Sequence, residues 1–119
     1  MMMMMMGAAA DKMQTTAQGS NAEKAVAWAY FYTDYGHWAV DANHGCRYDS
    51  DTNVPGIVEL CVDWNKGPNG RAHFIFVGQN RRCLLNTKLL GETRCTSHIE
   101  DGVSSHCWQH EWTEVACTW

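Results

Sequence analysis

The chain has 119 residues, a formal charge of −4 and 45% hydrophobic residues, which is the size of one domain and excludes wholesale disorder. No apolar run reaches the roughly 18 residues of a transmembrane helix. The acidic balance argues against a general nucleic-acid coat. We therefore expect one globular domain, with no membrane span and no nucleic-acid partner.

The N-terminal residues 1–22 lack a periodic apolar face. They begin with six methionines and continue through three alanines into a polar stretch. A segment with no apolar face can bury little apolar surface. Burial therefore does not offset the conformational entropy that the segment would lose on becoming ordered. We expect a disordered leader or tail over residues 1–22 and a single β domain over residues 23–119.

Residues 25–32 predict the first strand. Large side chains fall on one face and small ones on the other, because the sequence reads AVAWAYFY. This period of two indicates a strand, with Val26, Trp28, Tyr30 and Tyr32 on the same face. Residues 37–41 predict a second, short strand.

Residues 57–64 and 71–77 predict a hairpin, because a Gly- and Asn-rich turn separates two apolar runs. Placing Trp64 opposite Arg71 puts Leu60 opposite Ile75. In that register Glu59, Cys61 and Asp63 share a face with Phe74 and Phe76. A shift of one residue would exchange the two faces.

The remaining segments complete an all-β pattern. Residues 82–90 read as a strand or as one helical turn, and residues 111–118 alternate again and should close the sheet. Glycines recur as turn signals at a spacing typical of a sandwich or barrel. We predict a small disulfide-stabilised antiparallel β-sandwich or barrel.

Six cysteines indicate an oxidising compartment and hence a secreted, extracellular protein. No C-x-x-C pair occurs, and we expect three disulfides among Cys46, Cys61, Cys83, Cys95, Cys107 and Cys117. Cys95 and Cys107 enclose a polar loop that a bridge would stabilise by about 3 kcal/mol, so we expect those two to pair. The alternative, a zinc site using His106, Cys107 and His110, lacks a fourth ligand.

Arginine and tryptophan mark a candidate binding surface. Residues 66–94 carry a net charge of +5 between two acidic segments, and a patch around Arg81 and Arg82 would suit an anionic partner. Six tryptophans are unusual for this length; Trp108 and Trp112 crowd the C-terminus and could form a sugar platform or a protein contact. We expect at least two of the six to be partly exposed.

Catalytic patterns are sparse. Glu59 and Asp63 would lie roughly 13 Å apart on one strand face, too far for a glycosidase pair. A metal-free ribonuclease would need a cluster such as His73, Glu59, Arg71 and His106, but the register above points Glu59 away from His73. We expect no catalytic residue, metal or other cofactor, and keep a ribonuclease-like hydrolase as an alternative.

Three segments carry a resemblance: Cys61-Val-Asp-Trp64, Asn80-Arg-Arg-Cys83 and the C-terminal EWTEVACTW of residues 111–119. In their general pattern of cysteines and β-strands, these segments resemble the small, secreted, cysteine-rich effectors and elicitors of fungi. The resemblance implies secretion, a disulfide-stapled β fold and action by binding a protein or carbohydrate outside the cell. We predict an effector-like binding protein, with a carbohydrate-binding module that uses exposed tryptophans as the alternative.

Overall fold

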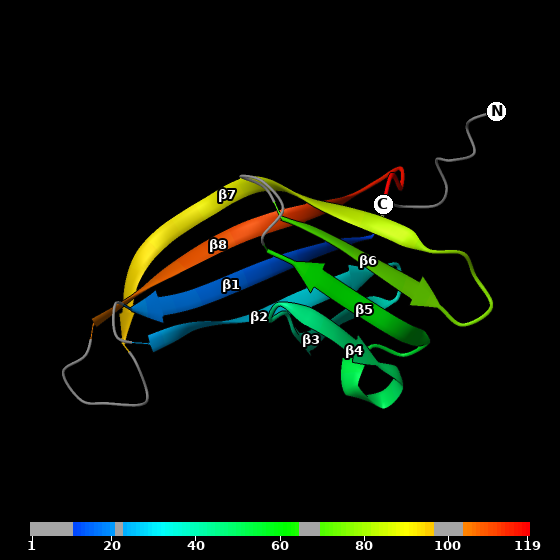
Figure 1. Ribbon diagram of the computed structural model, residues 1–119, viewed down its shortest axis with the longest axis horizontal. Helices are drawn as coiled ribbons and strands as arrows, with labels where there is room; N and C mark the ends of the chain where they lie inside the picture. Colours follow the sequence, from blue (N-terminus) through cyan, green and yellow to red (C-terminus); the bar gives the residue numbers. More distant parts are fainter. Residues whose placement is uncertain (1–10, 21–22, 65–69, 97–103) are drawn as a thin grey trace.

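The structure is a computed structural model that describes residues 11–20, 23–64, 70–96 and 104–119. Within these residues, eight antiparallel strands form one sheet in the order β3-β2-β1-β8-β7-β6-β5-β4 (Figure 1). The predicted all-β class is confirmed. The elements are β1 (Lys12–Ser20), β2 (Glu23–Thr33), β3 (Gly36–Asp41), β4 (Gly45–Tyr48), the 3-10 helix η1 (Asp49–Thr52), β5 (Ile57–Asp63), β6 (Arg71–Phe76), β7 (Arg82–Thr96) and β8 (Ser104–Val115).

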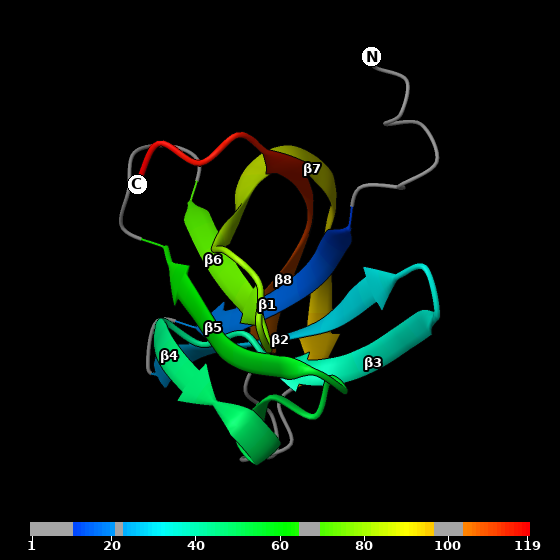
Figure 2. The same cartoon turned by 90° about the vertical axis from the view of Figure 1, so that its right-hand side faces the viewer.

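The sheet is an up-and-down meander in which the last strand returns to the first. Consecutive strands pair with one another except β3 and β4, and β8 pairs with β1. The sheet curls into a nearly closed barrel whose two edges are β3 and β4 (Figure 2). Of the two predicted architectures, the structure has the barrel-like one. An eight-stranded barrel has room either for packed side chains or for one small ligand.

Large apolar side chains fill part of this interior. Phe31 and Phe74 meet edge to face with ring centroids 5.0 Å apart. The Trp112 indole N–H donates a hydrogen bond to Thr15 Oγ1 at 2.9 Å, which satisfies the one polar atom of a fully buried ring. The largest side chains of this packed core are Met13, Phe31, Leu60, Phe74, Leu84 and Trp112.

Strand β1 corrects the expectation that residues 1–22 lie outside the domain. It sits between β2 and β8 and pairs with both, and its Met13 and Thr15 are buried. The prediction failed because only Met13 on its inward face is strongly apolar, while the backbone hydrogen bonds to two neighbours hold the strand in place. Residues 1–10 lie outside the described residues.

The hairpin of β5 and β6 differs from its predicted register by one residue. Asp63 lies opposite Arg71, and Leu60 lies opposite Phe74. This register buries Phe74 with Leu60 in the core, whereas the predicted one would have placed Phe74 beside charged side chains. The two faces of β6 are therefore exchanged relative to the prediction, while those of β5 are as predicted, and the outer face carries Glu59, Cys61, Asp63, Arg71 and His73.

Two disulfides join described cysteines. Cys46 and Cys61 are directly opposite each other on β4 and β5, and Cys83 on β7 is bonded to Cys117 in the C-terminal tail. Cys107 is also disulfide-bonded, and no described cysteine is free. The expected pairing of Cys107 with Cys95 depends on the Cys95 side chain, which lies outside the described residues.

The other predicted strands are present with different ends. Residues 82–90 belong to the long strand β7 rather than to a helical turn, and β8 begins at Ser104, well before residue 111. On β2, Trp28 and Tyr30 share one face, as the alternation predicted; this face is exposed, while Ala27 and Ala29 on the other face are buried. No helix in the described part of the chain is long and apolar enough to cross a membrane.

Candidate functional site

A hollow of about 350 Å³ lies between β1, β2 and β8 on one side and Trp64, the residue after β5, on the other. Across the sheet, Ala27 pairs with Ala17, and Ala17 pairs with Trp108. These small alanines leave the space that large side chains fill in the packed core. We call the hollow the aromatic cleft, and it is lined by Ala17, Val26, Ala27, Asn43, His44, Trp64, Trp108 and His110.

Aromatic rings form the walls of this cleft and are held by their own contacts. The Trp64 ring meets the His110 ring at 6.2 Å and the Trp112 ring at 5.1 Å, both edge to face. Trp64 Nε1 also donates a hydrogen bond to the Ala42 carbonyl oxygen at 2.8 Å. Trp108 is stacked on His106 with centroids 5.8 Å apart. The two indoles are therefore fixed before any ligand arrives.

The polar groups of the cleft are few and well placed. Asn43 Oδ1 accepts a hydrogen bond from the Ala27 backbone N–H at 2.8 Å, and Asn43 Nδ2 donates one to Asp41 Oδ1 at 2.8 Å. Burial lowers the pKa of His110, so its imidazole is neutral at pH 7 and can donate and accept hydrogen bonds. In the part of the chain that the structure describes, no Lys, Arg, Asp or Glu lines this cleft.

A second hollow, the polar cleft, lies on the outer face of β4, β5 and β6 and has a volume of about 370 Å³. The Cys83–Cys117 disulfide pins the C-terminal tail over this face, where the Arg71 guanidinium lies 4.8 Å from the centre of the Trp119 ring. His44, near β4, lies 3.8 Å from Asp63 on β5. Charged groups of both signs therefore surround this cleft.

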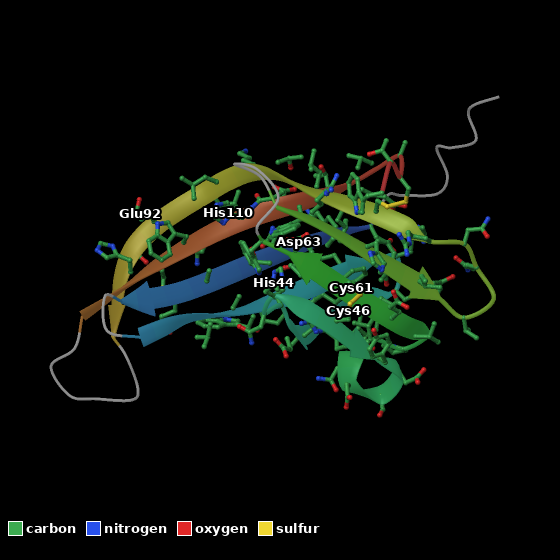
Figure 3. The ribbon with its side chains drawn as sticks, viewed as in Figure 1. His44, Cys46, Cys61, Asp63, Glu92 and His110 are labelled. Carbon is green, nitrogen blue, oxygen red and sulfur yellow. A yellow bond between two sulfur atoms is a disulfide. The ribbon has the colours of Figure 1, made fainter. Side chains whose placement is uncertain are left out.

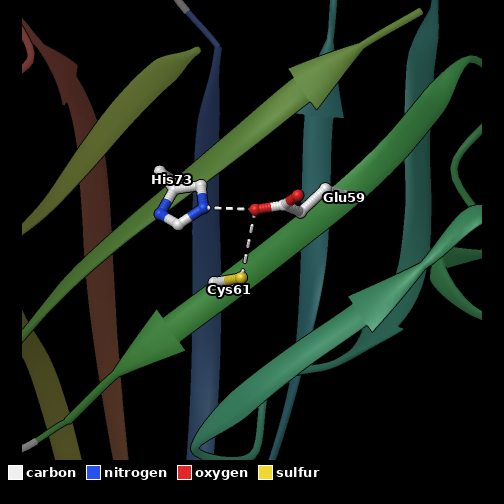
Figure 4. A group of neighbouring side chains, drawn as sticks. All are labelled: Glu59, Cys61 and His73. Atoms are coloured by element: carbon white, nitrogen blue, oxygen red, sulfur yellow. Dashed lines mark hydrogen bonds and ion pairs between the residues drawn. The ribbon is translucent and has the colours of Figure 1, made fainter.

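Glu59 and His73 are in direct contact at its edge. His73 Nε2 lies 2.7 Å from Glu59 Oε2, and Cys61 Sγ lies 3.5 Å from the same oxygen (Figure 4). The sulfur belongs to a disulfide and carries no hydrogen, so this second contact is one of proximity and not a hydrogen bond. The contact of His73 with Glu59 corrects the expectation that Glu59 points away from His73.

The ribonuclease-like cluster is assembled only in part. Glu59 and His73 are paired, and Arg71 lies on the same face two residues from His73. His106, the fourth group, instead lies 3.8 Å from Glu92 of β7. Figure 3 shows Glu92 toward the end of the long strands, away from Cys61 and Cys46. General acid–base chemistry needs both groups at one reacting site, and this pair of histidines does not provide it.

The four predicted binding residues have different surroundings. Trp108 lines the aromatic cleft and Arg81 lines the polar cleft. Trp112 is fully buried, which corrects the expectation that it contacts a partner. Arg82 donates two hydrogen bonds to Glu114, each at 2.7 Å, and lies 3.5 Å from Asp11. Its charge is compensated within the barrel, so Arg81 and Arg82 do not form one basic patch.

Sequence reasoning missed Trp64, Asn43 and His44 as partners of Trp108. They come from segments far from β8 in the chain, and only the curled sheet brings them together. One signal was available: the alanines at 17, 27 and 29 share the inner face, and small inward residues mark a place where a barrel is not filled.

A further aromatic surface, the outer strip, lies on β2. Trp28 and Tyr30 point to solvent with exposed fractions of 43% and 48%, and Val26, which also lines the aromatic cleft, is 47% exposed. With Trp28 exposed and Trp38, Trp64, Trp108 and Trp119 partly buried, the expectation of at least two partly exposed tryptophans is confirmed. This strip is an exposed surface, whereas the aromatic cleft is a hollow.

No family model, no curated protein and no solved structure matches this chain.

Proposed function

We propose that the protein is a secreted, effector-like binding protein whose aromatic cleft holds a neutral sugar. The observation that carries this proposal is the cleft itself, with two fixed indoles around a hollow of about 350 Å³. Small-molecule sites are concave, mostly apolar, and carry a few polar groups that orient the ligand, and the mouth of a β-barrel is a common place for them.

The chemistry of the lining favours a sugar over other small molecules. The apolar face of a sugar ring can lie on an indole, and its hydroxyl groups can bond to neutral polar side chains such as Asn43 and His110. The described residues of the lining include no carboxylate or fixed cation, so a charged ligand would lose its hydration without gaining a partner among them. The fitting ligand is therefore an uncharged mono- or disaccharide unit.

Secretion is proposed on the chemistry of the cysteines. Two disulfides join described residues and Cys107 is bonded as well, and such bridges form and persist outside the reducing cytosol. The test is to assay the medium and the lysate of the producing cells for the protein. Recovery from the medium with all cysteines oxidised would support secretion, and retention in the lysate as the free thiol form would contradict it.

Calorimetric titration tests the sugar proposal. The probes are neutral oligosaccharides of glucose, mannose, xylose and N-acetylglucosamine. We expect at least one series to bind, and Trp108→Ala to weaken that binding by at least about tenfold, as is usual for a buried aromatic anchor. Trp28→Ala, which removes an exposed indole of the outer strip, is the matched control and should bind like the parent.

Two results would contradict the sugar proposal. One is that no member of the panel binds. The other is that Trp28→Ala abolishes binding while Trp108→Ala does not, which would move the binding surface to the outer strip. Far-ultraviolet circular dichroism and cooperative urea unfolding like those of the parent show for each variant that loss of binding is not loss of fold.

A further inference from the structure

A row of potential metal ligands crosses three neighbouring strands on the outer face. Cys46 of β4 lies opposite Cys61 of β5, and Cys61 lies opposite His73 of β6. Glu59, two residues before Cys61 on the same face, completes the group (Figure 4). The ligand atoms of Glu59, Cys61 and His73 lie within 4.8 Å of one another.

The oxidised protein offers only two of these four groups to a metal. The two sulfur atoms are bonded to each other, and it is the thiolate of cysteine that acts as a ligand. Glu59 and His73 alone are too few for a protein zinc site, which takes three or four side chains. The disulfide therefore keeps the cluster unable to hold an ion.

Breaking the disulfide changes the ligand set. Two cysteine thiolates, one imidazole and one carboxylate are all established zinc ligands. In a tetrahedral site with bonds of about 2.0–2.3 Å, neighbouring ligand atoms are roughly 3.3–3.8 Å apart. Cys61 Sγ already lies 3.5 Å from Glu59 Oε2, and His73 Nε2 lies 2.7 Å from it. The contact of His73 with Glu59 must therefore open by about 0.6 Å. The Cys46 sulfur lies outside the compact group of Glu59, Cys61 and His73, so it must part from the Cys61 sulfur and turn toward that group, and reduction frees it to do so.

We propose that reduction of the Cys46–Cys61 disulfide creates a zinc site formed by Cys46, Cys61, His73 and Glu59. A dithiol reductant supplies two electrons and two protons: the S–S bond breaks, two protein thiols form, and the dithiol becomes a cyclic disulfide. Zinc then binds as the two thiols release their protons. The strands that carry the ligands are held by backbone pairing in either state.

The site is accessible to both reagents. Cys46 is exposed and Cys61 is half-buried, and both line the polar cleft. Arg71, a fixed cation of the same face, lies over the Trp119 ring. A secreted protein of this design would be free of zinc outside the cell and would gain the ion on entering a reducing compartment.

The test measures zinc binding to the full chain with and without a dithiol reductant. The probe is zinc chloride, and the readout is metal retained after gel filtration, together with competition against a chelating dye. We expect no bound zinc in the oxidised protein and one equivalent in the reduced protein. Cobalt substitution should give the strong visible absorption of a tetrahedral site, with sulfur-to-metal bands in the near ultraviolet.

Variants assign the ion to this cluster. His73→Ala should weaken zinc binding by at least about tenfold, whereas His37→Ala, which removes an exposed histidine outside the cluster, should leave it unchanged. Cys46→Ser/Cys61→Ser serves as the reference, because it retains the other cysteines and lacks both proposed thiolates. Oxidised His73→Ala should unfold with the same cooperativity as the parent.

The outcomes separate cleanly. If zinc binds the reduced Cys46→Ser/Cys61→Ser variant as tightly as the reduced parent, the ion is held by other cysteines and the proposal is wrong. The same holds if reduced parent and His73→Ala bind equally. If the reduced parent unfolds without metal, recovery of its near-ultraviolet circular dichroism on adding zinc supports the site, and failure to recover refutes it. None of these results depends on sugar binding.

Discussion

The packed core and the aromatic cleft are built on the same strands and differ in the size of their inward side chains. On β2, Phe31 fills the core, whereas Ala27 leaves a hollow. On β8, Trp112 is fully buried and bonded to Thr15, whereas Trp108 lines the cleft. The difference teaches that side-chain volume along a strand can divide one barrel into a region that stabilises and a region that binds.

The largest loss of stability should come from the packed core. Phe74→Ala removes a fully buried ring that contacts Phe31, and such changes cost about 3–5 kcal/mol. Trp108→Ala removes a larger ring from the cleft and should cost less than Phe74→Ala, because one side of that ring faces a hollow. Urea unfolding of both variants provides the measurement, and equal losses would mean that the two regions are packed alike.

Gly70→Ala should give an intermediate loss. A methyl group at Gly70 would lie 2.9 Å from the Trp112 ring and 3.0 Å from the Asp63 carbonyl oxygen. Overpacking of this kind costs about 1–3 kcal/mol, and neither the core ring nor the backbone can move aside easily. Gly78→Ala is the comparison for a glycine that has open space around it but a positive φ of 75°. A Gly70→Ala variant as stable as the parent would show that the Trp112 ring has room to shift.

The pH dependence of stability should include a contribution from Asp11. Burial raises the pKa of Asp11 to about 6 from 3.8, against the opposing effect of Arg82. Because the folded state favours the protonated carboxyl, this contribution is fully present below pH 3.8 and is lost as the pH rises through about 6. Asp11→Asn should remove it, so that stability falls less between these pH values than in the parent.

Urea unfolding at several pH values measures this difference. Asp51→Asn, at an exposed position of η1, controls for the loss of one negative charge. If the parent and Asp11→Asn show the same pH dependence, the carboxyl titrates as it would in the unfolded chain and is not desolvated in the fold.

Filling the aromatic cleft should have the smallest effect on the free energy of unfolding. It should also have the largest effect on sugar binding. Ala27→Leu places a branched side chain in the hollow beside Ala17 and Trp108. Since space is available, we expect the free energy of unfolding to change by no more than about 1 kcal/mol, while sugar binding is lost. Melting curves and calorimetric titration of the same preparation check both parts, and a variant that binds normally would place the ligand elsewhere.

The sequence predicts local features of this fold better than long-range ones. The alternation of Trp28 and Tyr30 with Ala27 and Ala29 follows from backbone geometry alone, and it was correct. The register of Glu59 against His73 depends on which face the rest of the barrel buries. When a hairpin has apolar residues on both faces, its sequence pattern does not distinguish two registers that differ by one residue.

The candidate site was less predictable for the same reason. Trp108 could be singled out because tryptophan is rare and large, but its neighbours Trp64 and Asn43 become neighbours only when β8 closes against β1. Strand β1 itself was missed because its pattern is polar. Its place is determined by two flanking strands rather than by its own hydrophobicity.

The most direct test of the cleft is a titration of protein labelled with ¹⁵N at tryptophan, followed by NMR. Each of the six tryptophans gives an indole N–H signal, which single substitutions assign. On addition of the best saccharide from the panel, we predict that the signals of Trp64 and Trp108 move in a saturable manner and that of Trp28 stays in place. Movement of the Trp28 signal alone, or no movement with any saccharide, would contradict the account.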